Sequence, residues 1–412
     1  YEPRLFKEWP AGERDEVSFA DFSGRAYPLG DLCFDVGGIR LGFEICEDAW
    51  VANRPGADLA LRGVDILLNP SASHFAFGKF AVRQRFVVEG SRAFSVAYVY
   101  ANLLGNEAGR VVYDGGALIA SGGELVARGP RFGFVDWELT CGIADIDGNR
   151  REQSRRGSHR PRHDAEEGVV RVPFRFPNRD PAAPAQISRS WEDGDHVKEE
   201  ELARAIALGL FDYMRKSRAH GFVVSISGGA DSAAVACLVG LAVELGVAQL
   251  GHAGFAARLG HIDGLAGAAD VPALVHRLLT CAYQATENSG AVTRDAARAV
   301  AAALGARFHL LDVDALMKGY VRLIEAAVGR PLTWDQDDVA LQNIQARVRG
   351  PSVWLLANLE NALLLATSNR SEAAVGYATM DGDTCGGLSP IAGIDKSYLR
   401  HWLRWLEQHG PS

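Results

Sequence analysis

The chain has 412 residues, a formal net charge of −8, 48% hydrophobic residues and 23% charged residues. This balance excludes disordered and fibrous proteins and argues against a nucleic-acid partner held by bulk charge. We see no apolar run of about 20 residues that would span a bilayer and no signal-peptide pattern at the N-terminus, so we expect no membrane partner. The six cysteines include no C-x-x-C pair, which favours reduced thiols in a cytoplasmic protein. The length suggests two or three domains.

The first part of the chain has the pattern of short strands separated by turns and helices. Gly37–Gly38 is a two-residue hairpin signal. Residues 64–69 (VDILLN) show no alternation, which is typical of a strand buried on both faces. The predicted elements are a hairpin in 32–42, strands at 39–46, 64–69 and 96–102, a helix over 80–92, and a hairpin around Gly122–Gly123 within 116–125. This pattern indicates an α/β domain.

A polar region separates the two halves of the chain. Residues 147–167 are rich in arginine and poor in apolar side chains, and residues 173–191 are rich in proline. We expect an irregular, solvated connection rather than a binding arm. The predicted organisation is a first domain over 1–170, a linker over 171–197 and a second domain over 198–412.

The second half alternates helices with strands. The predicted elements are helices over 198–217, 232–245, 295–304 and 339–361, and strands over 221–225, 307–313 and 363–366. Such alternation predicts a parallel sheet with helices on both faces.

The sharpest motif is S-G-G-A-D-S at 227–232, between the strand at 221–225 and the following helix. Glycines allow an anion to approach backbone N–H groups, and the helix N-terminus favours negative charge. The hydroxyls of Ser227 and Ser232 can donate to phosphate oxygens, and Asp231 can hold a divalent cation. The motif lacks a Walker lysine and the spacing of a dinucleotide loop. It resembles the pyrophosphate loop of the ATP-pyrophosphatase family, whose members adenylate a carboxylate or carbonyl and release pyrophosphate.

Four further runs and one lysine narrow the resemblance to NAD synthetases. These are YQATENS at 283–289, NIQAR at 343–347, TSNRSE at 367–372, VGYATMDGD at 375–383 and Lys396. Together with the glycine loop they resemble NAD synthetases over residues 200–412, more closely than GMP synthetases or other enzymes with this loop.

This resemblance implies two substrates, ATP and deamido-NAD, and Mg²⁺. The residues implied for ATP are Ser225, Ser227, Gly228, Gly229, Asp231, Ser232, Thr367 and Lys396, and those for deamido-NAD are Asn343, Arg347, Tyr377, Thr379 and Met380. Asp231 and Glu372 are the implied magnesium ligands. Alternatively, Arg347 pairs with a helix neighbour and Lys396 is an ordinary surface residue.

Cys46 lies in the run GFEICEDAW at 42–50, which we predict to be the end of an apolar strand. A buried cysteine there is usually inert, and its three acidic neighbours disfavour a thiolate, so activation requires a cation from elsewhere in the fold. The run resembles the nucleophile strand of nitrilase-type amidases, in the glutamine-dependent branch of NAD synthetases. The resemblance implies an α-β-β-α sandwich in which Cys46 attacks the glutamine amide, forms a thioester and releases ammonia.

The run NPSASHF at 69–75 continues this resemblance, which implies Ser73 and Lys79 at the glutamine and Glu2 as an auxiliary acid. His74 has no role by resemblance, although a Cys–His pair stays open. The family's catalytic lysine and first glutamate would precede Tyr1. We therefore expect these residues to be the interior of a longer polypeptide, with the amidase domain incomplete at its start and the synthetase domain incomplete at its end.

The predicted function is ATP-dependent amidation of deamido-NAD to NAD through an adenylated intermediate, with ammonia taken from glutamine through an enclosed passage. We expect a homo-oligomer formed through the synthetase domain. Two alternatives remain. One is another ligase with the same loop, of the GMP or asparagine type. The other is a truncated nucleotide-binding form without glutaminase activity.

Overall fold

The computed structural model describes residues 9–19, 24–107, 109–157, 159–162, 164–178, 181–182 and 190–412. They divide into two compact units. Gly105–Val112, Gly133–Val135 and Ser190–Ser412 form the second unit, and the other described residues form the first. Two short stretches from the first half of the chain therefore belong to the second unit, which nothing in the sequence pattern indicated.

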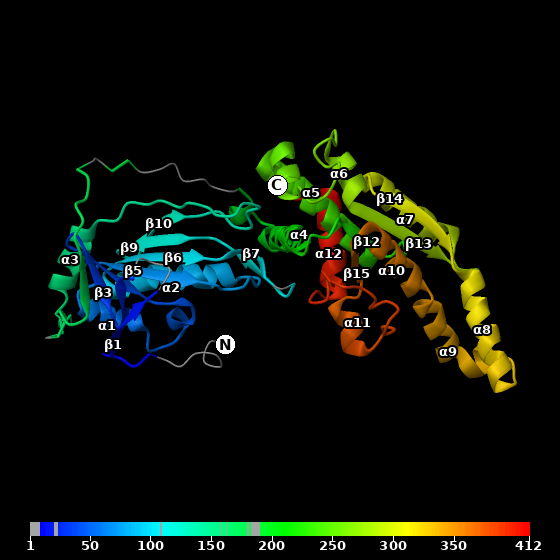
Figure 1. Cartoon of the computed structure of the whole chain (residues 1–412), viewed down its shortest axis with the longest axis horizontal. Helices are drawn as coiled ribbons and strands as arrows, with labels where there is room; N and C mark the ends of the chain where they lie inside the picture. Colours follow the sequence, from blue (N-terminus) through cyan, green and yellow to red (C-terminus); the bar gives the residue numbers. More distant parts are fainter. Residues whose placement is uncertain are drawn as a thin grey trace. The chain divides into compact units, whose positions relative to one another are not determined.

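The first unit is built on a seven-stranded mixed sheet with the strand order β10-β9-β6-β5-β4-β3-β11 (Figure 1). Its strands are β3 (Cys33–Val36), β4 (Ile39–Phe43), β5 (Ile66–Ser71), β6 (Ala97–Asn102), β9 (Leu118–Ser121), β10 (Glu124–Arg128) and β11 (Val169–Val172). The central β4, β5 and β6 are parallel. A separate antiparallel ribbon joins β1 (Arg14–Ser18) to β2 (Ala26–Gly30).

Helices α1 (Pro55–Leu61) and α2 (Lys79–Phe94) pack against this sheet. Their apolar side chains form one core with the central strands, around Val87, Tyr98 and Leu118. The described residues thus account for one large sheet and its helices, half of the four layers of an α-β-β-α sandwich. Both predicted hairpins are confirmed, and each turns at a glycine pair with positive φ, 59° and 87° at Gly37–Gly38 and 61° and 89° at Gly122–Gly123.

The polar region differs from the sequence prediction of an irregular connection. It contains α3 (Ile146–Arg155) and is followed by β11, which extends the first sheet. The Asp145 side chain caps α3 by accepting from Gly148 N at 2.8 Å. Arg150 of α3 forms a two-pronged ion pair with the buried Asp65, at 2.6 and 2.7 Å. Ion pairing and capping hold this helix in place of an apolar stripe, which is why its composition resembled a linker.

The sheet of the second unit has the order β14-β13-β12-β15, and every pairing in it is parallel. Its strands are β12 (Phe222–Ser225), β13 (Leu279–Ala285), β14 (Arg307–Asp312) and β15 (Leu363–Leu365). The chain moves from β12 to β13 and β14 on one side and then returns to place β15 on the other side of β12. The loops after β12 and β15 therefore diverge at a topological switch point, where open parallel sheets bind their ligands.

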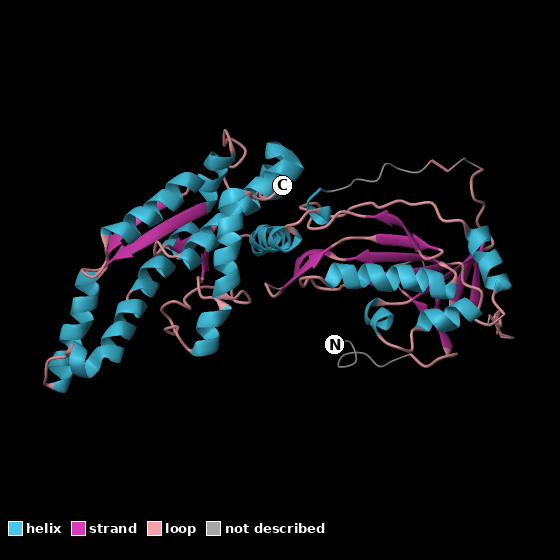
Figure 2. Cartoon of the chain, turned by 180° about the vertical axis from the view of Figure 1, so that it is seen from behind, coloured by secondary structure: helices cyan, strands magenta, loops and turns pink. Residues whose placement is uncertain are grey.

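Helices cover both faces of this sheet (Figure 2). The unit contains α4 (Val197–Ser217), α5 (Ala230–Arg258), α6 (Val271–Leu278), α7 (Ala291–Leu304), α8 (Asp314–Val328), α9 (Trp334–Arg347), α10 (Arg349–Glu360), α11 (Arg370–Val375) and α12 (Lys396–Gln408). On β12, Val224 joins the core shared with α4, α5, α7 and α12, whereas Val223 joins a second core with α10. This alternation follows the two-residue period of a strand, and the predicted helix–sheet–helix layering is confirmed.

Two predicted helices differ in extent from the structure. The helix expected over 339–361 is divided into α9 and α10 at Val348, because Pro351 has no N–H to bond the carbonyl of Arg347. The helix expected over 232–245 is the longer α5, which bends at Gly251. By length and composition α5 is the one described helix that qualifies to cross a bilayer, which corrects the expectation that no run was apolar enough; 56% of its most apolar window is buried inside the protein.

A ribbon of β7 (Leu104–Glu107) and β8 (Val111–Asp114) is fastened to α4 by a buried carboxylate. Asp212 accepts from Asn106 N at 2.7 Å, from Lys216 Nζ at 2.8 Å and from Arg215 Nη2 at 2.6 Å. Burial alone would raise the pKa of Asp212, but these hydrogen bonds outweigh burial and hold the pKa below its usual value. This group therefore stays ionised and ties the ribbon to the helix.

Candidate active site

The S-G-G-A-D-S loop joins the end of β12 to the first turn of α5. Ile226 N donates to Ala282 O of β13 at 2.9 Å, which fixes where the loop leaves the sheet. Gly228 has φ +79°, and a Cβ atom there would lie 2.2 Å from the carbonyl oxygen of Thr293. Gly229 is the N-cap of α5. The first glycine is thus required by the backbone turn and by the approach of α7.

The two serines of the loop are bonded to each other. Ser232 Oγ accepts from Ser227 N at 3.1 Å, lies 3.1 Å from Ser227 Oγ and donates to Gly229 O at 3.2 Å. Ser232 is 2% exposed, and its hydroxyl serves to shape the loop. The loop is therefore organised by its own side chains, leaving the first N–H groups of α5 at its open end.

Three predicted residues meet at this helix N-terminus. Lys396 Nζ lies 3.0 Å from Asp231 Oδ2 and 2.8 Å from Glu372 Oε1. Asn369 Nδ2 donates to the other oxygen of Asp231 at 3.1 Å. The hydrogen bonds that Lys396 donates to Glu372 and then to Asp231 raise its pKa, so the ammonium stays charged. One acid from the first turn of α5, one acid from the first turn of α11 and a lysine from α12 thus form one cluster.

Local helix starts hold this cluster in place. Asn369 is the N-cap of α11, and its side chain accepts from Glu372 N at 3.0 Å in a capping box. Lys396 is the first residue of α12, whose N-cap Asp395 accepts from Tyr398 N at 2.8 Å. The sequence predicted Glu372 and Lys396 but gave Asn369 no role. A capping pattern, N-x-x-E at 369–372, marks it.

The chemistry of this cluster suits magnesium in company with phosphate. In the part of the chain that the structure describes, no group of three or more His, Cys, Asp or Glu side chains is placed to hold a metal. Asp231 and Glu372 are two carboxylates joined through one ammonium. Magnesium commonly takes one or two carboxylates and completes its shell with waters and phosphate oxygens, so this pair fits.

The residues predicted for the dinucleotide converge on a second turn. Thr379 Oγ1 donates to Asn343 Oδ1 at 3.1 Å, and Arg347 Nε donates to Met380 O at 3.0 Å. Asn343 and Arg347 lie one turn apart on α9, so one helix face carries both. Met380 and Tyr377 are largely exposed, at 68% and 81%.

A network that the sequence did not reveal connects this region to the glycine loop. Ser225 Oγ at the end of β12 donates to Gln284 Oε1 at 2.8 Å. The amide of Gln284 donates to Ser352 Oγ at 2.6 Å and to the carbonyl of Arg349. Thr367, also predicted for ATP, follows β15, the strand on the other side of β12. Gln284 lies in the run YQATENS at 283–289, but nothing in the sequence indicated that it would bond Ser225.

In the first unit, Cys46 begins the short 3-10 helix η2 (Cys46–Trp50). Strand β4 ends at Phe43, three residues earlier than the cysteine, which corrects the expected strand over 39–46. Cys46 has φ +50°, an uncommon conformation for a residue other than glycine. The cysteine is therefore presented on a tight turn beyond the sheet and is partly exposed.

The acidic neighbours of Cys46 are engaged elsewhere. Glu44 is fully buried and accepts from Arg54 Nη2 at 2.6 Å and from Tyr98 Oη at 2.5 Å. Burial and the charge of Glu44 raise the pKa of Tyr98, which remains a neutral donor. Asp48 accepts from Ile45 N at 2.9 Å and so closes η2. Two of the three acids thus shape the turn.

Two basic side chains, Lys79 and the buried Arg83, contact the backbone at residues 73–74, where the sequence predicted glutamine to bind. Lys79 Nζ donates to His74 O at 3.0 Å and lies 5.5 Å from the ring centre of Trp50. Burial, then the charge of Arg83, lowers the pKa of Lys79, while Cys46 is among the groups that attract its charge. Lys79 is thus one positive charge in the neighbourhood of Cys46.

Arg83 organises the backbone beside Lys79. It is fully buried, pairs with Asp114 at 2.6 Å and donates to Ser73 O at 2.8 Å. Burial, then Lys79 and Arg83, lowers the pKa of His74, which disfavours a protonated His74. The sequence analysis predicted no role for Arg83. Arg83 lies on the buried face of α2 with Phe80 and Val87, and an arginine at such a position in the sequence could have indicated a buried ion pair.

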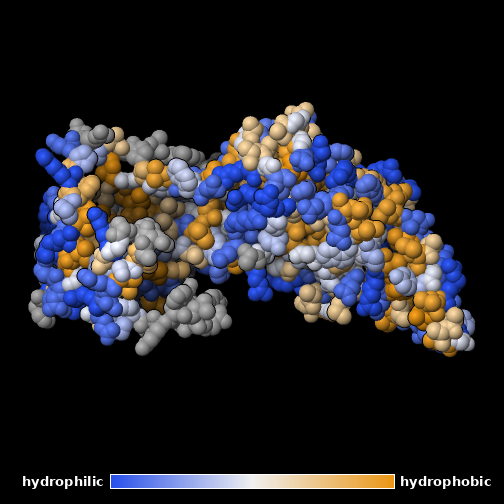
Figure 3. Space-filling view, viewed as in Figure 1, coloured by the Kyte–Doolittle hydropathy of each residue, from blue (hydrophilic) through white to orange (hydrophobic). Residues whose placement is uncertain are grey.

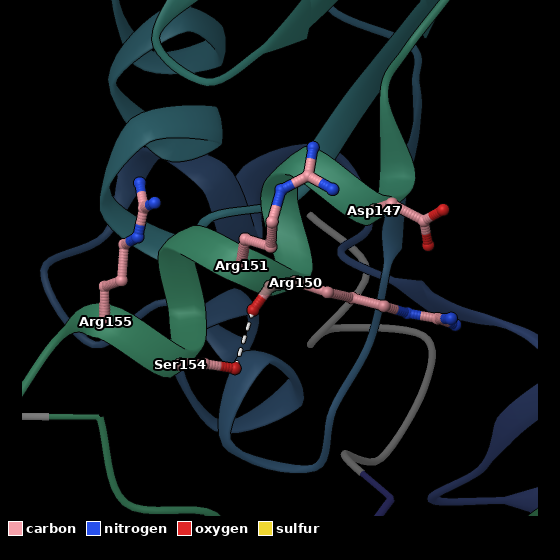
Figure 4. Close-up of a pocket in the computed structure, with 5 residues that line it drawn as sticks. All are labelled: Asp147, Arg150, Arg151, Ser154 and Arg155. Carbon is pink, nitrogen blue, oxygen red and sulfur yellow. Dashed lines mark hydrogen bonds between the residues drawn. The ribbon is translucent and has the colours of Figure 1, made fainter.

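The remaining predicted residue and the other cysteines add little to either site. Glu2 lies outside the described residues. Burial raises the pKa of Cys237 to about 11 and that of Cys281 to about 12, so both thiols stay protonated near neutral pH. An open depression along α3, shown in Figure 4, lies apart from every predicted site residue. It is lined by Asp147, Arg150, Arg151, Ser154 and Arg155.

The fold and its sites define a class: a nitrilase-like α/β unit joined to a parallel-sheet unit with a pyrophosphate-type loop at its switch point. Residues 2–156 match the carbon-nitrogen hydrolase family model, and residues 202–408 match the NAD synthase model. The chain belongs to the NAD synthase family, with a carbon-nitrogen hydrolase domain before the synthase domain.

Several relatives match nearly the whole chain. Glutamine-dependent NAD(+) synthetases from Oryza sativa subsp. indica and Bos taurus are 32% and 31% identical over 90% and 98% of this chain, which covers 53% and 61% of those proteins. A crystal structure of a glutamine-dependent NAD(+) synthetase from Cytophaga hutchinsonii has a TM-score of 0.78 and 40% identity, covering 99% of this chain and 61% of that one. The chain therefore spans about half to three-fifths of the length of these relatives.

Proposed function

We propose that this protein converts deamido-NAD to NAD, using ATP to activate the carboxylate and glutamine as the source of ammonia. The observation that carries the proposal is the cluster of Asp231, Glu372 and Lys396 at the N-terminus of α5. It places two acids and a fixed ammonium beside a loop suited to a triphosphate. Relatives that match both halves of the chain are named glutamine-dependent NAD(+) synthetases, which supports the same assignment.

The roles follow from position. The N–H groups of the 227–232 loop and of the first turn of α5 bind the phosphates, with Thr367 beside them. Asp231 and Glu372 would hold Mg²⁺, which would neutralise phosphate charge when bound. Lys396, which the two carboxylates hold beside the loop, supplies positive charge to the departing pyrophosphate. Asn343, Arg347 and the 377–380 turn hold deamido-NAD.

The synthetase reaction balances in two steps. A carboxylate oxygen of deamido-NAD attacks the α-phosphorus of ATP, the bond to the β-phosphate oxygen breaks and pyrophosphate leaves. Ammonia then attacks the acyl carbon of the adenylate and loses a proton. AMP leaves with the former carboxylate oxygen, and the product is the amide, NAD.

An oxygen-18 experiment tests this chemistry. Deamido-NAD labelled in its carboxylate is incubated with ATP, Mg²⁺ and ammonia, and the products are analysed by mass spectrometry. We expect one labelled oxygen in AMP and none in pyrophosphate. Label in pyrophosphate or in neither product would exclude adenylation, and no NAD at all would exclude the assignment to this ligase.

The nitrogen is supplied by the first unit. Cys46 Sγ attacks the side-chain amide carbon of glutamine, the thiol proton passes to the leaving nitrogen, and ammonia departs. Water then hydrolyses the thioester to glutamate. The strained turn of Cys46 exposes the thiol, Lys79 supplies nearby positive charge, and Ser73 lies on the backbone that Arg83 holds. We place this chemistry in the cytoplasm.

An exposed apolar surface supports a homo-oligomer of the synthetase unit. We define the apolar helix surface as the exposed large apolar side chains of α8, α9 and α10: Leu316, Tyr320, Leu323, Ile324, Val328, Trp334, Val339, Trp354, Leu355 and Leu359. Figure 3 shows hydrophobic residues (orange) gathered over the end of the unit that carries α8 and α9. Contiguous patches of this kind mark protein interfaces. We propose a second copy of the chain as the occupant, because the surface is apolar rather than charged, as in the interfaces of obligate dimers.

Light scattering with size-exclusion chromatography tests this interface. We expect a mass of at least twice that of one chain for the wild type and a single-chain mass for Leu323→Glu/Leu359→Glu. A wild-type monomer, or a double variant that keeps its oligomeric mass, would contradict the proposed interface.

A further inference from the structure

Arg349, the first residue of α10, is a half-buried cation held by backbone carbonyls. Its Nη1 donates to Gln345 O at 2.9 Å and its Nε to Gln284 O at 3.5 Å. Among the residues that the structure describes, no carboxylate lies within 4 Å of its guanidinium. Arg307 and Arg330 of the same unit each have one, Glu360 at 2.8 Å and Asp337 at 2.7 Å.

An arginine in this setting is energetically unusual. The guanidinium keeps its charge in proteins, so it cannot relieve the cost of burial by deprotonation. Burial is the main influence on Arg349 and lowers its pKa, with partial compensation from the charges of Asp383 and Tyr283. Two carbonyls satisfy only part of a group with five N–H donors. The site is therefore suited to an anion that the chain itself does not supply.

The position of Arg349 indicates which anion. Gln345, whose carbonyl it contacts, lies between Asn343 and Arg347, the residues proposed for deamido-NAD. Gln284, its other contact, bonds Ser225 at the start of the phosphate loop. The guanidinium thus lies where the dinucleotide residues and the ATP loop meet. In the proposed reaction, the group that must lie at this junction is the carboxylate that attacks ATP.

We propose that Arg349 binds the nicotinate carboxylate of deamido-NAD and distinguishes this substrate from the amide product. This inference rests on the proposed function. A guanidinium donates two parallel hydrogen bonds to a carboxylate and holds it in a fixed plane. The product amide is neutral and presents one N–H₂ group toward the same donors, so it binds less well and leaves. Arg349 is in this account both a positioning residue for the attacking oxygen and the specificity determinant of the site.

Binding measurements on the full chain test the inference. Dissociation constants for deamido-NAD and for NAD are measured by calorimetry on wild type, Arg349→Gln and Arg349→Lys. We expect Arg349→Gln to weaken deamido-NAD binding about tenfold or more, as for loss of a charge-assisted hydrogen bond, while NAD binding changes little. Arg349→Lys should retain part of the preference because it keeps the charge.

The outcomes separate the possible roles. An equal loss for both ligands would overturn the inference and assign Arg349 to a phosphate or to structure, since both ligands carry the same phosphates. Unchanged binding of deamido-NAD would overturn it as well. Arg322→Gln, on exposed α8, is the matched control and should leave both constants unchanged. If wild type binds deamido-NAD and still fails in the oxygen-18 experiment, the proposed function falls separately.

Discussion

The contacts of Lys396 support a functional role that its sequence position alone does not establish. In the sequence it is one of 43 basic residues, and a surface role was a fair alternative. In the structure its ammonium joins the carboxylates of Asp231 and Glu372, which lie 141 residues apart in the chain, in the first turns of α5 and α11. A lysine so held is positioned before any substrate arrives, which is the condition for electrostatic stabilisation of a leaving group.

Lys396→Met is expected to remove this positive charge while keeping most of the side-chain bulk. We expect turnover with ammonia to fall about 10²–10³-fold, as for loss of one preorganised charge. Steady-state rates at saturating substrates measure this. Lys198→Met, on the first turn of α4, is the control, and a Lys396 variant with full activity would remove this lysine from the mechanism.

At the scale of helices, strands and loops, some features could be predicted from the sequence and others could not. The prediction of β12, the S-G-G-A-D-S loop and α5 from sequence succeeded because an apolar run, a glycine pair and an apolar helix follow one another directly. The contacts of Gln284 and Arg349 were not predictable, because they depend on the break between α9 and α10 at Val348. The helix α3 was missed because ion pairs rather than apolar side chains hold it.

Gly228→Ala tests the geometry of the loop. The added Cβ would lie 2.2 Å from Thr293 O, and φ +79° disfavours any side chain, so we expect a loss of at least about 1–2 kcal/mol in stability and weaker ATP binding. Gly251→Ala shares a positive φ of 68° but meets nothing within 4 Å, so it controls for strain alone. Thermal unfolding and ATP titration measure both effects. Equal ATP affinity in wild type and Gly228→Ala would refute the close packing of the loop.

The ribbon of β7 and β8 gives a prediction that depends on pH. Because the folded pKa of Asp212 is below its unfolded value near 3.8, its stabilisation is present above that value and is lost as the pH falls through the folded pKa. We expect Asp212→Asn to cost about 1–2 kcal/mol at pH 7, with the difference from wild type shrinking below about pH 4. Urea unfolding across this range measures it, and a difference independent of pH would contradict an ionised Asp212.

At the scale of the whole molecule, both units were anticipated as α/β domains, the first of nitrilase type and the second of NAD synthetase type, and the family models confirm both. The sequence did not predict that residues 105–112 and 133–135 belong to the second unit, because a short segment in the first half of the chain gives no indication of the unit that it joins.

The proposed division of labour between the units predicts a split in nitrogen donors. In the protein expressed from its own gene, Cys46→Ala should abolish NAD formation from glutamine and keep formation from ammonia. Cys237→Ala, at a half-buried thiol of α5, is the matched control. Loss of activity with both donors at unchanged stability would show that the two sites are not separate.

The most direct test of the account is exchange of labelled pyrophosphate into ATP. Reversible adenylation of deamido-NAD requires neither glutamine nor ammonia, so wild type and Cys46→Ala should both incorporate label when deamido-NAD is present and not when it is omitted. Asp231→Asn should lose the exchange. Exchange that persists in Asp231→Asn, or that does not depend on deamido-NAD, would contradict activation of this carboxylate at the 227–232 loop.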